Sequence, residues 1–287
     1  MALGPLAPID RLTLAYLAVA LGFTIARGPR TLPLAVLLPC ALVLTALVAT
    51  ILAPRARRSG PLGQLLAEIY PLLLTPALYT HVGLVNAASG VGHDALVQRW
   101  EQALFGAQVS LAWIRAFPSP SWSTLMHAAY LSFYPILAAA PLGLWFSGRR
   151  RASRAAALAM MSTFYACYTV FFCFPVAGPR YSFAMVENSA TAVPLAAFSH
   201  RLLELGSAWG TAFPSSHVAA ALVAAVCAWR GWRPLGVVLL VAASLLTLGT
   251  VYCQFHYAID ALSGLVVAAL VLSVLREPRA DARAREE

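Results

Sequence analysis

The segment Val251–Asp260 reads VYCQFHYAID and leads into an apolar run that extends to about Leu275. A run of this length and composition predicts a transmembrane helix. His256 and Asp260 stand four residues apart, so a helix that included both would carry them on one face, one turn apart. The carboxylate would then hold one imidazole nitrogen as N–H and leave the other as a nucleophile or a base. The segment therefore predicts one half of a reaction centre as well as a helix.

A second polar cluster, Phe213–His217 (FPSSH), opens another long apolar run. The N-terminus of a helix has unpaired N–H groups and a partial positive charge, which suit a phosphate group. Ser215 and Ser216 would add hydroxyl donors, although a serine cap on an ordinary proline-started helix also explains them. Because the cap leaves His217 without a role, we expect His217 to be a second reactive group.

Arg180 lies in the loop before this cluster, within Gly178–Tyr181 (GPRY). Its guanidinium is a permanent cation with a planar fork of donors, which suits a phosphoryl group. Taken alone, Arg180 is more simply explained as an interfacial arginine that reaches to water. In the company of two histidines on the same side of the membrane, it becomes a predicted phosphate-binding residue.

The composition indicates an integral membrane protein. Of 287 residues, 60% are hydrophobic and 11% are charged, and the mean hydropathy is +0.75. A soluble domain carries about a quarter charged residues. The net charge of +9 comes entirely from arginine, since the chain has no lysine. These arginines cluster between apolar segments, so we interpret them as an orientation signal and expect no nucleic-acid partner.

The apolar segments predict an all-α polytopic membrane protein with about eight transmembrane helices. The expected spans are residues 12–26, 31–53, 64–87, 123–147, 154–174, 214–230, 234–252 and 256–275. We expect residues 1–60 to form two N-terminal spans, residues 61–275 to form the catalytic core, and residues 276–287 to form a cytoplasmic tail. The first span is short and could lie partly in the interface.

Arginine clusters follow the second, fourth, sixth and eighth spans, and cytoplasmic loops are enriched in arginine. The clusters are Arg55, Arg57 and Arg58; Arg149, Arg150, Arg151 and Arg154; Arg230 and Arg233; and Arg276, Arg279, Arg283 and Arg285. Both termini are then expected in the cytoplasm, and the reaction centre at the exoplasmic surface of a bacterial-type inner membrane. Arg27 and Arg30 are exceptions that a re-entrant first span would remove.

Two further regions have predicted features. Residues 93–118 alternate charged side chains, such as Asp94 and Glu101, with large apolar ones, which predicts a helix lying in the membrane interface. For its second half a plain loop is as good an interpretation. In the fourth span His127, Tyr130 and Tyr134 are spaced three and four apart, so we expect them on one face, for packing or for substrate contact.

Together these groups suggest in-line phosphoryl transfer through a covalent intermediate. His256 would attack phosphorus, Asp260 would fix its tautomer, and His217 would protonate the leaving oxygen and later activate the acceptor. Arg180, Ser215, Ser216 and the helix N-terminus would neutralise the phosphoryl oxygens. We expect no metal or other cofactor, because the sequence has neither a carboxylate cluster nor a CxxC pair to hold a metal.

At these residues the chain resembles the type 2 phosphatidate phosphatase superfamily, whose pattern is K-x6-R-P, P-S-G-H and S-R-x5-H-x3-D. Pro214–His217 matches the second motif, and His256 with Asp260 matches the third. The resemblance implies a six-helix core that acts on lipid phosphates. The chain departs from the pattern at five positions: Cys173, Tyr181 and Ser216 replace Lys, Pro and Gly, and Gly249 and Thr250 replace the Ser-Arg pair. Two expected phosphate-binding cations are therefore missing.

Phe174–Arg180 (FPVAGPR) together with Gln254–Tyr257 (QFHY) looks more like the branch of inositol phosphorylceramide synthases and related sphingolipid synthases. That resemblance implies transfer of a phospho-headgroup from a phosphohistidine to a lipid hydroxyl. We expect Tyr181, Gln254, Tyr257 and Tyr130 to line the substrate site.

Two alternatives remain open from the sequence. One is a lipid or polyprenyl (di)phosphate phosphatase that uses water as the acceptor. The other is a non-catalytic lipid carrier or transporter that keeps the site as a binding pocket. In each case the expected partners are a membrane lipid and the bilayer, and no protein partner is predicted.

Overall fold

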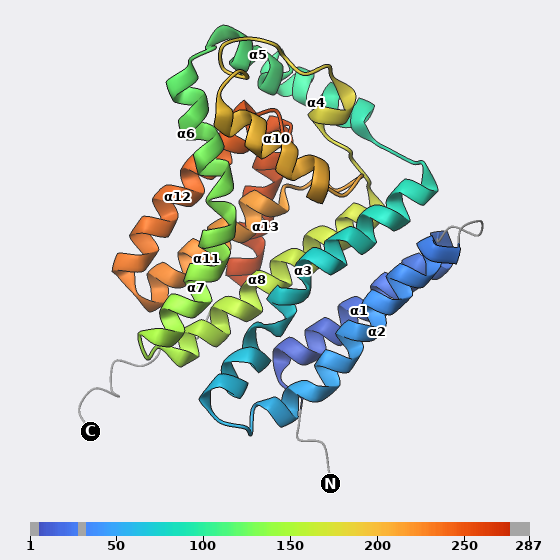
Figure 1. The fold of residues 1–287 in the computed structure, drawn as a ribbon, viewed down its shortest axis with the longest axis vertical. Coiled ribbons are helices and arrows are strands. Elements are labelled where there is room, and N and C mark those ends of the chain that lie inside the picture. The colour runs from blue at the N-terminus through green and yellow to red at the C-terminus, as the bar shows by residue number, and fades with distance from the viewer. Residues whose placement is uncertain (1–5, 28–32, 276–287) are drawn as a thin grey trace.

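The computed structural model describes residues 6–27 and 33–275, and this part of the chain folds into helices without named strands (Figure 1). The helices are α1 (Pro8–Arg27), α2 (Pro33–Ala56), α3 (Pro61–Ser89), α4 (Asp94–Phe105), α5 (Val109–Ala116), α6 (Pro120–Leu131), α7 (Phe133–Phe146), α8 (Arg150–Cys173), α9 (Pro179–Ser182), α10 (Pro194–Gly206), α11 (Ser216–Gly231), α12 (Arg233–Tyr252) and α13 (Ala258–Val274). The predicted tail, residues 276–287, and Arg30 lie outside the described residues.

The all-α membrane fold is confirmed. Three helices, α1, α8 and α12, are long and apolar enough to cross a membrane, and α6 with α7 makes a fourth candidate. Shorter apolar helices occupy 43–56, α11 and α13. Each of the eight expected spans therefore coincides with helical structure, but only three or four meet the criterion of length and apolarity among the described residues.

The predicted span at 123–147 corresponds to two helices, α6 and α7, which together meet the criterion for one span but are bent by 42° at Ser132. The N–H of Ser132 still bonds to the carbonyls of the preceding turn, so the chain bends without leaving the helical region. As a consequence, Tyr130 is buried whereas Tyr134 is 54% exposed. Tyr130 and Tyr134 nevertheless both line the crevice described below, whereas His127 is buried and lies outside that lining.

The last helix begins at Ala258, two residues later than predicted, so His256 lies in the turn before it. The carboxylate of Asp260 accepts the backbone N–H of Tyr257, with an N···O distance of 2.9 Å, and so caps the helix. A carboxylate in the first turn is also favoured by the helix dipole. His256 and Asp260 are neighbours because of this cap, and not because they share a helix face.

Helix α11 lies at the centre of the core and packs against α7, α8, α12 and α13. Its contact with α13 is close at Gly264, where an added Cβ would lie 2.6 Å from the carbonyl oxygen of Ser215. The N–H of Ser215 in turn donates to the carbonyl of Asp260 at 2.9 Å. These two contacts hold the N-termini of α11 and α13 side by side.

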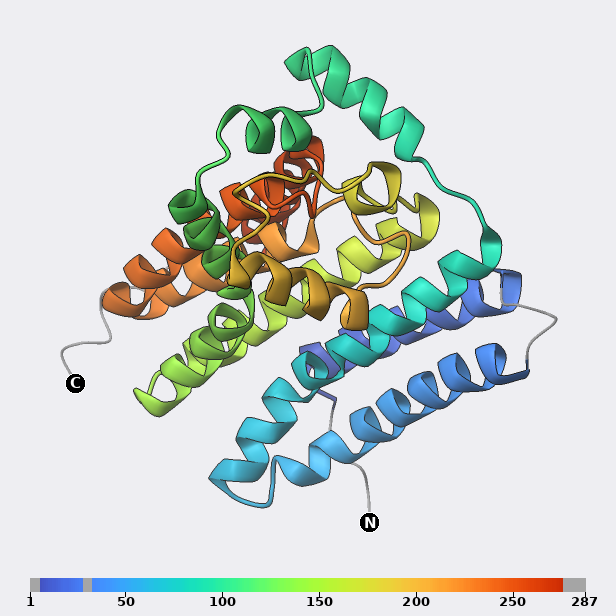
Figure 2. The ribbon, with the colours of Figure 1, turned by 45° about the horizontal axis from the view of Figure 1, so that its top comes forward.

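Helices α4, α5 and α10 gather at the end of the bundle where α11 and α13 begin (Figures 1 and 2). The region predicted as one interfacial helix forms two, α4 and α5, so the alternative of a loop in its second half is wrong. The buried carboxylate of Glu101 accepts the N–H of Val109 and the N–H of Ile259. Glu101, which belongs to α4, thereby fixes α4 and α5 to the start of α13.

The first two helices form an outer pair that packs on α3 and α8 (Figure 2). Asp10 is fully buried at the start of α1 and accepts two hydrogen bonds from Arg57, which follows α2. Tyr70 of α3 donates a further hydrogen bond to the same carboxylate. One buried acidic group therefore connects α1, α2 and α3.

Candidate active site

The two predicted reactive histidines lie together. The ring centroids of His217 and His256 are 5.6 Å apart, with the planes at 61°. His217 comes from the first turn of α11, and His256 from the turn between α12 and α13. In that turn the N–H groups of Phe255 and His256 both donate to the carbonyl of Thr250. Gln254 takes the left-handed conformation, with φ of 61°, to make the turn this tight.

Asp260 lies behind His256. The distance from His256 Nδ1 to Asp260 Oδ2 is 3.4 Å, which makes a long contact that would tighten in a reacting complex. Asp260 is fully buried, and its Oδ1 has no hydrogen-bond partner among the described residues. Because Nδ1 faces the carboxylate, Nε2 of His256 is the ring nitrogen that would act as the nucleophile.

The cavity in front of the histidines also contains Arg180. Its lining includes Tyr130, Arg180, Tyr181, Ser207, His217 and His256. Arg180 donates to the hydroxyl of Ser207 at 3.1 Å, and its guanidinium lies 5.0 Å from the centre of the Tyr181 ring. Of the described residues that line this cavity, Arg180 alone carries a fixed charge. The hydroxyl of Tyr130 lies 3.5 Å from Nε2 of His217.

The other predicted residues lie around the cavity without lining it. Ser215 caps α11 by accepting the N–H of Val218, and it is fully buried. Gln254 is buried in the histidine turn, and the hydroxyl of Tyr257 contacts Asp94 and Ser182 instead. Ser216 faces a neighbouring crevice. Among the four residues expected to line the substrate site, Tyr130 and Tyr181 therefore line the cavity, and Gln254 and Tyr257 do not.

Asp94 is a residue whose contribution was not predicted. Its carboxylate accepts the consecutive N–H groups of Ala177 and Gly178, at 2.9 and 2.8 Å, and the hydroxyl of Ser182 at 3.2 Å. These three groups belong to the segment that carries Arg180. Asp94 therefore determines where the guanidinium lies, although it makes no contact with the cavity itself.

Burial determines the protonation of His256. Removal from water lowers the pKa of His256 to about 4, although a backbone hydrogen bond with Ala212 acts in the opposite direction. His200 of α10 also has a lowered pKa, because it is buried and lies near the positive charge of Arg180. Near neutral pH His256 is consequently an uncharged imidazole, which is the form that can act as a nucleophile.

A crevice adjoins this cavity and extends along the bundle between α3, α7 and α8. It has a volume of about 260 Å³ and shares Tyr79, Tyr130 and His217 with the cavity. Its lining is mainly apolar: Phe133 lies against His217, with 4.3 Å between the ring centroids, and Leu137 and Phe164 lie on the walls beyond it. Phe164 lies nine residues before the end of α8, so the crevice reaches about 14 Å along the helix axis.

A model of the PAP2 superfamily matches residues 95–274. The chain belongs to this superfamily, the type 2 phosphatidate phosphatases. The match includes both histidines, Asp260 and Arg180, and membership supports an enzyme of the phosphatase type. No curated protein and no solved structure matches the chain. Helices α1 to α3 lie before the matched residues.

The structure also gives the locations of the positions that depart from the PAP2 pattern. Gly249 packs against α6, where an added Cβ would lie 2.5 Å from the carbonyl oxygen of Met126. Thr250 is fully buried beneath the histidine turn. Cys173 is exposed at the end of α8. The pattern's lysine and arginine positions therefore contribute no cation, and a larger residue at Gly249 would displace α6.

Proposed function

We propose that this PAP2-superfamily enzyme transfers the phospho-headgroup of a lipid phosphodiester to the hydroxyl of a second lipid, through a phosphohistidine at His256. This is the activity of the inositol phosphorylceramide synthase-like branch. The proposal includes an active site at the exoplasmic surface and both termini in the cytoplasm, as the arginine clusters predict.

The observation that carries the proposal is the apolar crevice. It ends at Ser216 and His217, so an alkyl chain lying against Leu137 and Phe164 would bring its polar end to the proposed base. Water needs no apolar path to reach an open cavity. A crevice with mainly apolar walls that ends at His217 supports a lipid acceptor instead.

The charge of the cavity supports a diester as the donor. Arg180 is the one fixed cation on its lining within the described chain. A phosphomonoester carries a charge of about −1.5 to −2 at neutral pH, whereas a phosphodiester carries a single negative charge. One guanidinium together with the N-terminal N–H groups of α11 suits the smaller charge.

The proposed reaction has two steps. In the first, Nε2 of His256 bonds to phosphorus while the bond to the donor's alcohol oxygen breaks, and His217 gives that oxygen a proton. In the second, His217 takes the proton from the acceptor hydroxyl, whose oxygen bonds to phosphorus as the P–N bond breaks. Asp260 stabilises the positive imidazole between the steps, and Arg180 neutralises the phosphoryl oxygens.

The first experiment traps the intermediate. Purified protein is incubated with mass-tagged lipid phosphodiesters and monoesters, quenched, and analysed for an acid-labile, base-stable adduct at His256, with and without a lipid alcohol. We expect adducts from diesters and faster discharge with the alcohol than with water. His256→Ala should give no adduct and His217→Ala should lose turnover, with both variants folded. Near-normal turnover in either variant contradicts the mechanism.

A second experiment uses the crevice. Leu137→Trp should narrow it and slow discharge to a lipid alcohol, while discharge to water stays unchanged. Val266→Trp is the matched control, because Val266 is 57% exposed on α13 and lies outside the crevice lining. Equal discharge rates in Leu137→Trp and wild type would remove the support for a lipid acceptor.

Superfamily membership favours the second candidate, a lipid or polyprenyl (di)phosphate phosphatase with water as the acceptor. Under that alternative the adduct forms from monoesters and its discharge is insensitive to lipid alcohols. Lipid binding without an adduct from any substrate would favour the third candidate, a non-catalytic lipid carrier.

A further inference from the structure

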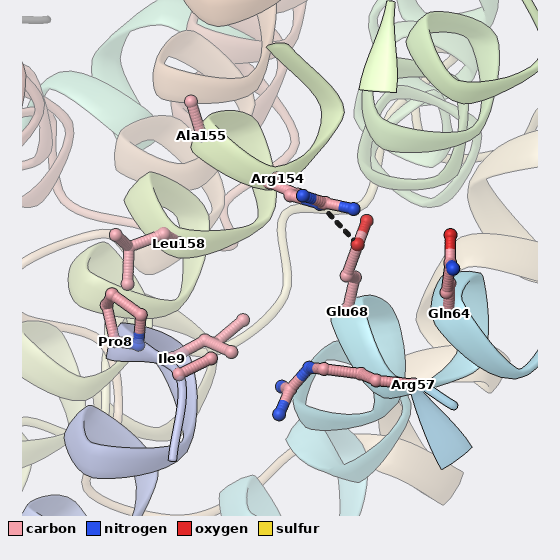
Figure 3. A pocket seen from close by; sticks show the side chains of 9 residues that line it. Pro8, Ile9, Arg57, Gln64, Glu68, Arg154, Ala155 and Leu158 are labelled. Carbon is pink, nitrogen blue, oxygen red and sulfur yellow. Dashed lines mark hydrogen bonds and ion pairs between the residues drawn. The ribbon is translucent and has the colours of Figure 1, made fainter. Parts of the chain in front are cut away.

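A second cavity lies at the other end of the bundle, among the starts of α1, α3 and α8 (Figure 3). It has a volume of about 410 Å³. Arg154 lies on its lining in the second turn of α8, 19 residues before the end of that helix at Cys173, and Ala177, four residues further on, lines the histidine cavity. At 1.5 Å per residue those 19 residues span about 29 Å, so the cavity is remote from the candidate active site.

One wall of this cavity is charged and the other is apolar. Figure 3 shows Glu68 between Arg154 and Arg57, with Pro8, Ile9 and Leu158 on the opposite side. An apolar wall beside charged groups at a helix end is the environment of a lipid at the membrane interface, where the tail and the headgroup meet.

The two arginines differ in what remains available to a ligand. Arg57 donates to both oxygens of Asp10 and to the carbonyl of Ala67, so its donors are largely used. Arg154 contacts Glu68 through Nε alone, and its side chain is 55% exposed. Its two terminal amino groups have no hydrogen-bond partner within the described chain, so they are available to a phosphate.

Glu68 provides a second polar contact. Its residue exposure is 6%, and its Oε2 has no hydrogen-bond partner among the residues that the structure describes. A buried carboxylate oxygen without a partner is costly, and it is satisfied when a ligand donates an O–H or N–H to it. The cavity therefore presents a phosphate-binding guanidinium beside an acceptor for a hydroxyl.

The surrounding charge favours a ligand with a net negative charge. Arg11, Arg55, Arg58, Arg150 and Arg151 are exposed around the same end of the bundle. The N-termini of α1, α3 and α8 also lie there and add partial positive charge. An ammonium headgroup would meet this field unfavourably, whereas a phosphate joined to a polyol would not.

We propose that this cavity binds an anionic phospholipid whose headgroup carries hydroxyl groups, with the phosphate on Arg154, a hydroxyl on Glu68 and an acyl chain along Ile9 and Leu158. The bound lipid would connect α1 and α3 to α8, and so would hold the helices before the matched residues against the PAP2 core. This lipid is a structural ligand and not the substrate, because about 29 Å of α8 separates the cavity from the end of the bundle that carries the histidines.

The test uses the purified full chain with phosphatidylglycerol, phosphatidylcholine of the same acyl chains, and glycerophosphoglycerol, which is the headgroup without tails. Lipids retained by the protein are counted by native mass spectrometry, and the thermal unfolding midpoint is measured. We expect about tenfold greater retention of phosphatidylglycerol than of phosphatidylcholine. Equal retention of the two lipids overturns the proposal, as does equal stabilisation by the tail-less headgroup.

The double variant Glu68→Gln/Arg154→Gln removes both charges without leaving either one buried and unpaired. It should lose most of the phosphatidylglycerol retention, whereas the matched double variant Arg201→Gln/Glu204→Gln, which removes an exposed ion pair of α10 outside the cavity lining, should retain the lipid like wild type. A double variant with wild-type retention overturns the proposal.

A measurement on the wild-type chain keeps the proposal testable where the double variant fails to fold. A diazirine-bearing phosphatidylglycerol should label peptides that contain Pro8 and Ile9, or Ala155 and Leu158. Labelling confined to other peptides overturns the proposal.

Discussion

At the scale of single residues, burial and two neighbouring groups, Asp260 and the carbonyl of Thr250, determine the charge and the position of His256. Burial keeps the imidazole neutral, Asp260 faces Nδ1, and the carbonyl of Thr250 fixes the backbone through two hydrogen bonds. The same burial raises the cost of a positive charge on His256. Asp260 is close enough to offset that cost once the phosphohistidine forms.

The lowered pKa of His256 leads to a prediction about pH. An ordinary histidine with a pKa of 6.5 is about one-tenth neutral at pH 5.5, whereas His256, with a pKa of about 4, stays almost fully neutral there. On the acid side, formation of the phosphoenzyme should therefore decline only as the pH falls toward 4. Single-turnover rates between pH 4 and pH 8 measure this decline. A half-point near pH 6.5 would contradict the assignment of His256 as a buried nucleophile.

The lowered pKa of His256 also makes the stability of the fold depend on pH. Between pH 6.5 and about 4 the unfolded chain binds a proton at this position and the folded chain does not, so His256 should lower the stability of the fold as the pH falls through that range. Above pH 6.5 both states are neutral at His256, and this contribution disappears.

Asp94→Asn is predicted to impair catalysis without touching the cavity. An amide has one acceptor oxygen, so it cannot accept the N–H groups of both Ala177 and Gly178 in the manner of the carboxylate. Loss of one hydrogen bond to a charged group costs about 1.5–3 kcal/mol and frees the segment that carries Arg180. We expect turnover to fall about tenfold or more, with KM increased. The measurement is steady-state kinetics on the folded variant.

Glu187→Gln is the control for Asp94→Asn, because it removes one exposed negative charge at the same end of the molecule. Equal kinetics in the two variants would show that the charge of Asp94, and not its hydrogen bonds, accounts for any loss. Unchanged kinetics in Asp94→Asn would reject the positioning role.

At the scale of helices, the site depends on the close contact of α11 with α13. Gly264 lets the two helices approach, and the N–H of Ser215 bonds to the carbonyl of Asp260 at the same place. Helices α4 and α5 are held to this contact by Glu101. A shift of α13 would therefore move Asp260 and His256 relative to His217.

Gly264→Ala is predicted to disturb this contact. Its Cβ would lie 2.6 Å from a backbone oxygen, so α13 must move, at a cost of about 1–3 kcal/mol. We expect a lower unfolding midpoint together with reduced turnover. Gly22→Ala in α1 is the matched control, since its Cβ would meet nothing within 4 Å and alanine favours a helix by up to about 1 kcal/mol. Equal unfolding midpoints for Gly264→Ala and Gly22→Ala would contradict the close contact of α11 with α13.

At the scale of the whole molecule, the two ends of the bundle have different chemistry. One end has the histidines, Arg180 and helices α4 and α5, and the other has the ion pair of Asp10 with Arg57 and the hydrogen bond from Tyr70, which connect α1, α2 and α3. The apolar crevice runs from the first end toward the middle of the bundle. Such an arrangement separates the proposed reaction from the groups that hold the N-terminal helices in place.

Arg57→Gln is predicted to loosen the N-terminal helices. It leaves the carboxylate of Asp10 buried without its cationic partner, and breaking a buried pair in this way costs about 3–5 kcal/mol. The double variant Asp10→Asn/Arg57→Gln removes both charges and should recover much of that loss. Limited proteolysis and the unfolding midpoint report the difference. If the double variant is no more stable than Arg57→Gln, the ion pair between Asp10 and Arg57 does not hold the N-terminal helices in place.

The sequence by itself determined the membrane class, the helical fold and the residue types of the centre. Apolar runs of about 20 residues can satisfy their backbone in a bilayer only as helices, and the motif spacing indicated the PAP2 superfamily. It also placed His217, His256 and Arg180 on one side, because the arginine clusters set the alternation of the spans. These properties depend on composition and local order, which a sequence contains in full.

Only the tertiary structure decided how those residues meet. His256 and Asp260 are adjacent through a helix cap instead of a shared face, and the chain bends at Ser132, between the buried Tyr130 and the exposed Tyr134. Asp94 and Glu101 looked like the polar face of an interfacial helix, yet both accept backbone N–H groups from distant segments. The physical reason is that caps, bends and carboxylate contacts depend on which unpaired backbone groups lie nearby in space. The spacing of residues along the chain does not specify those neighbours.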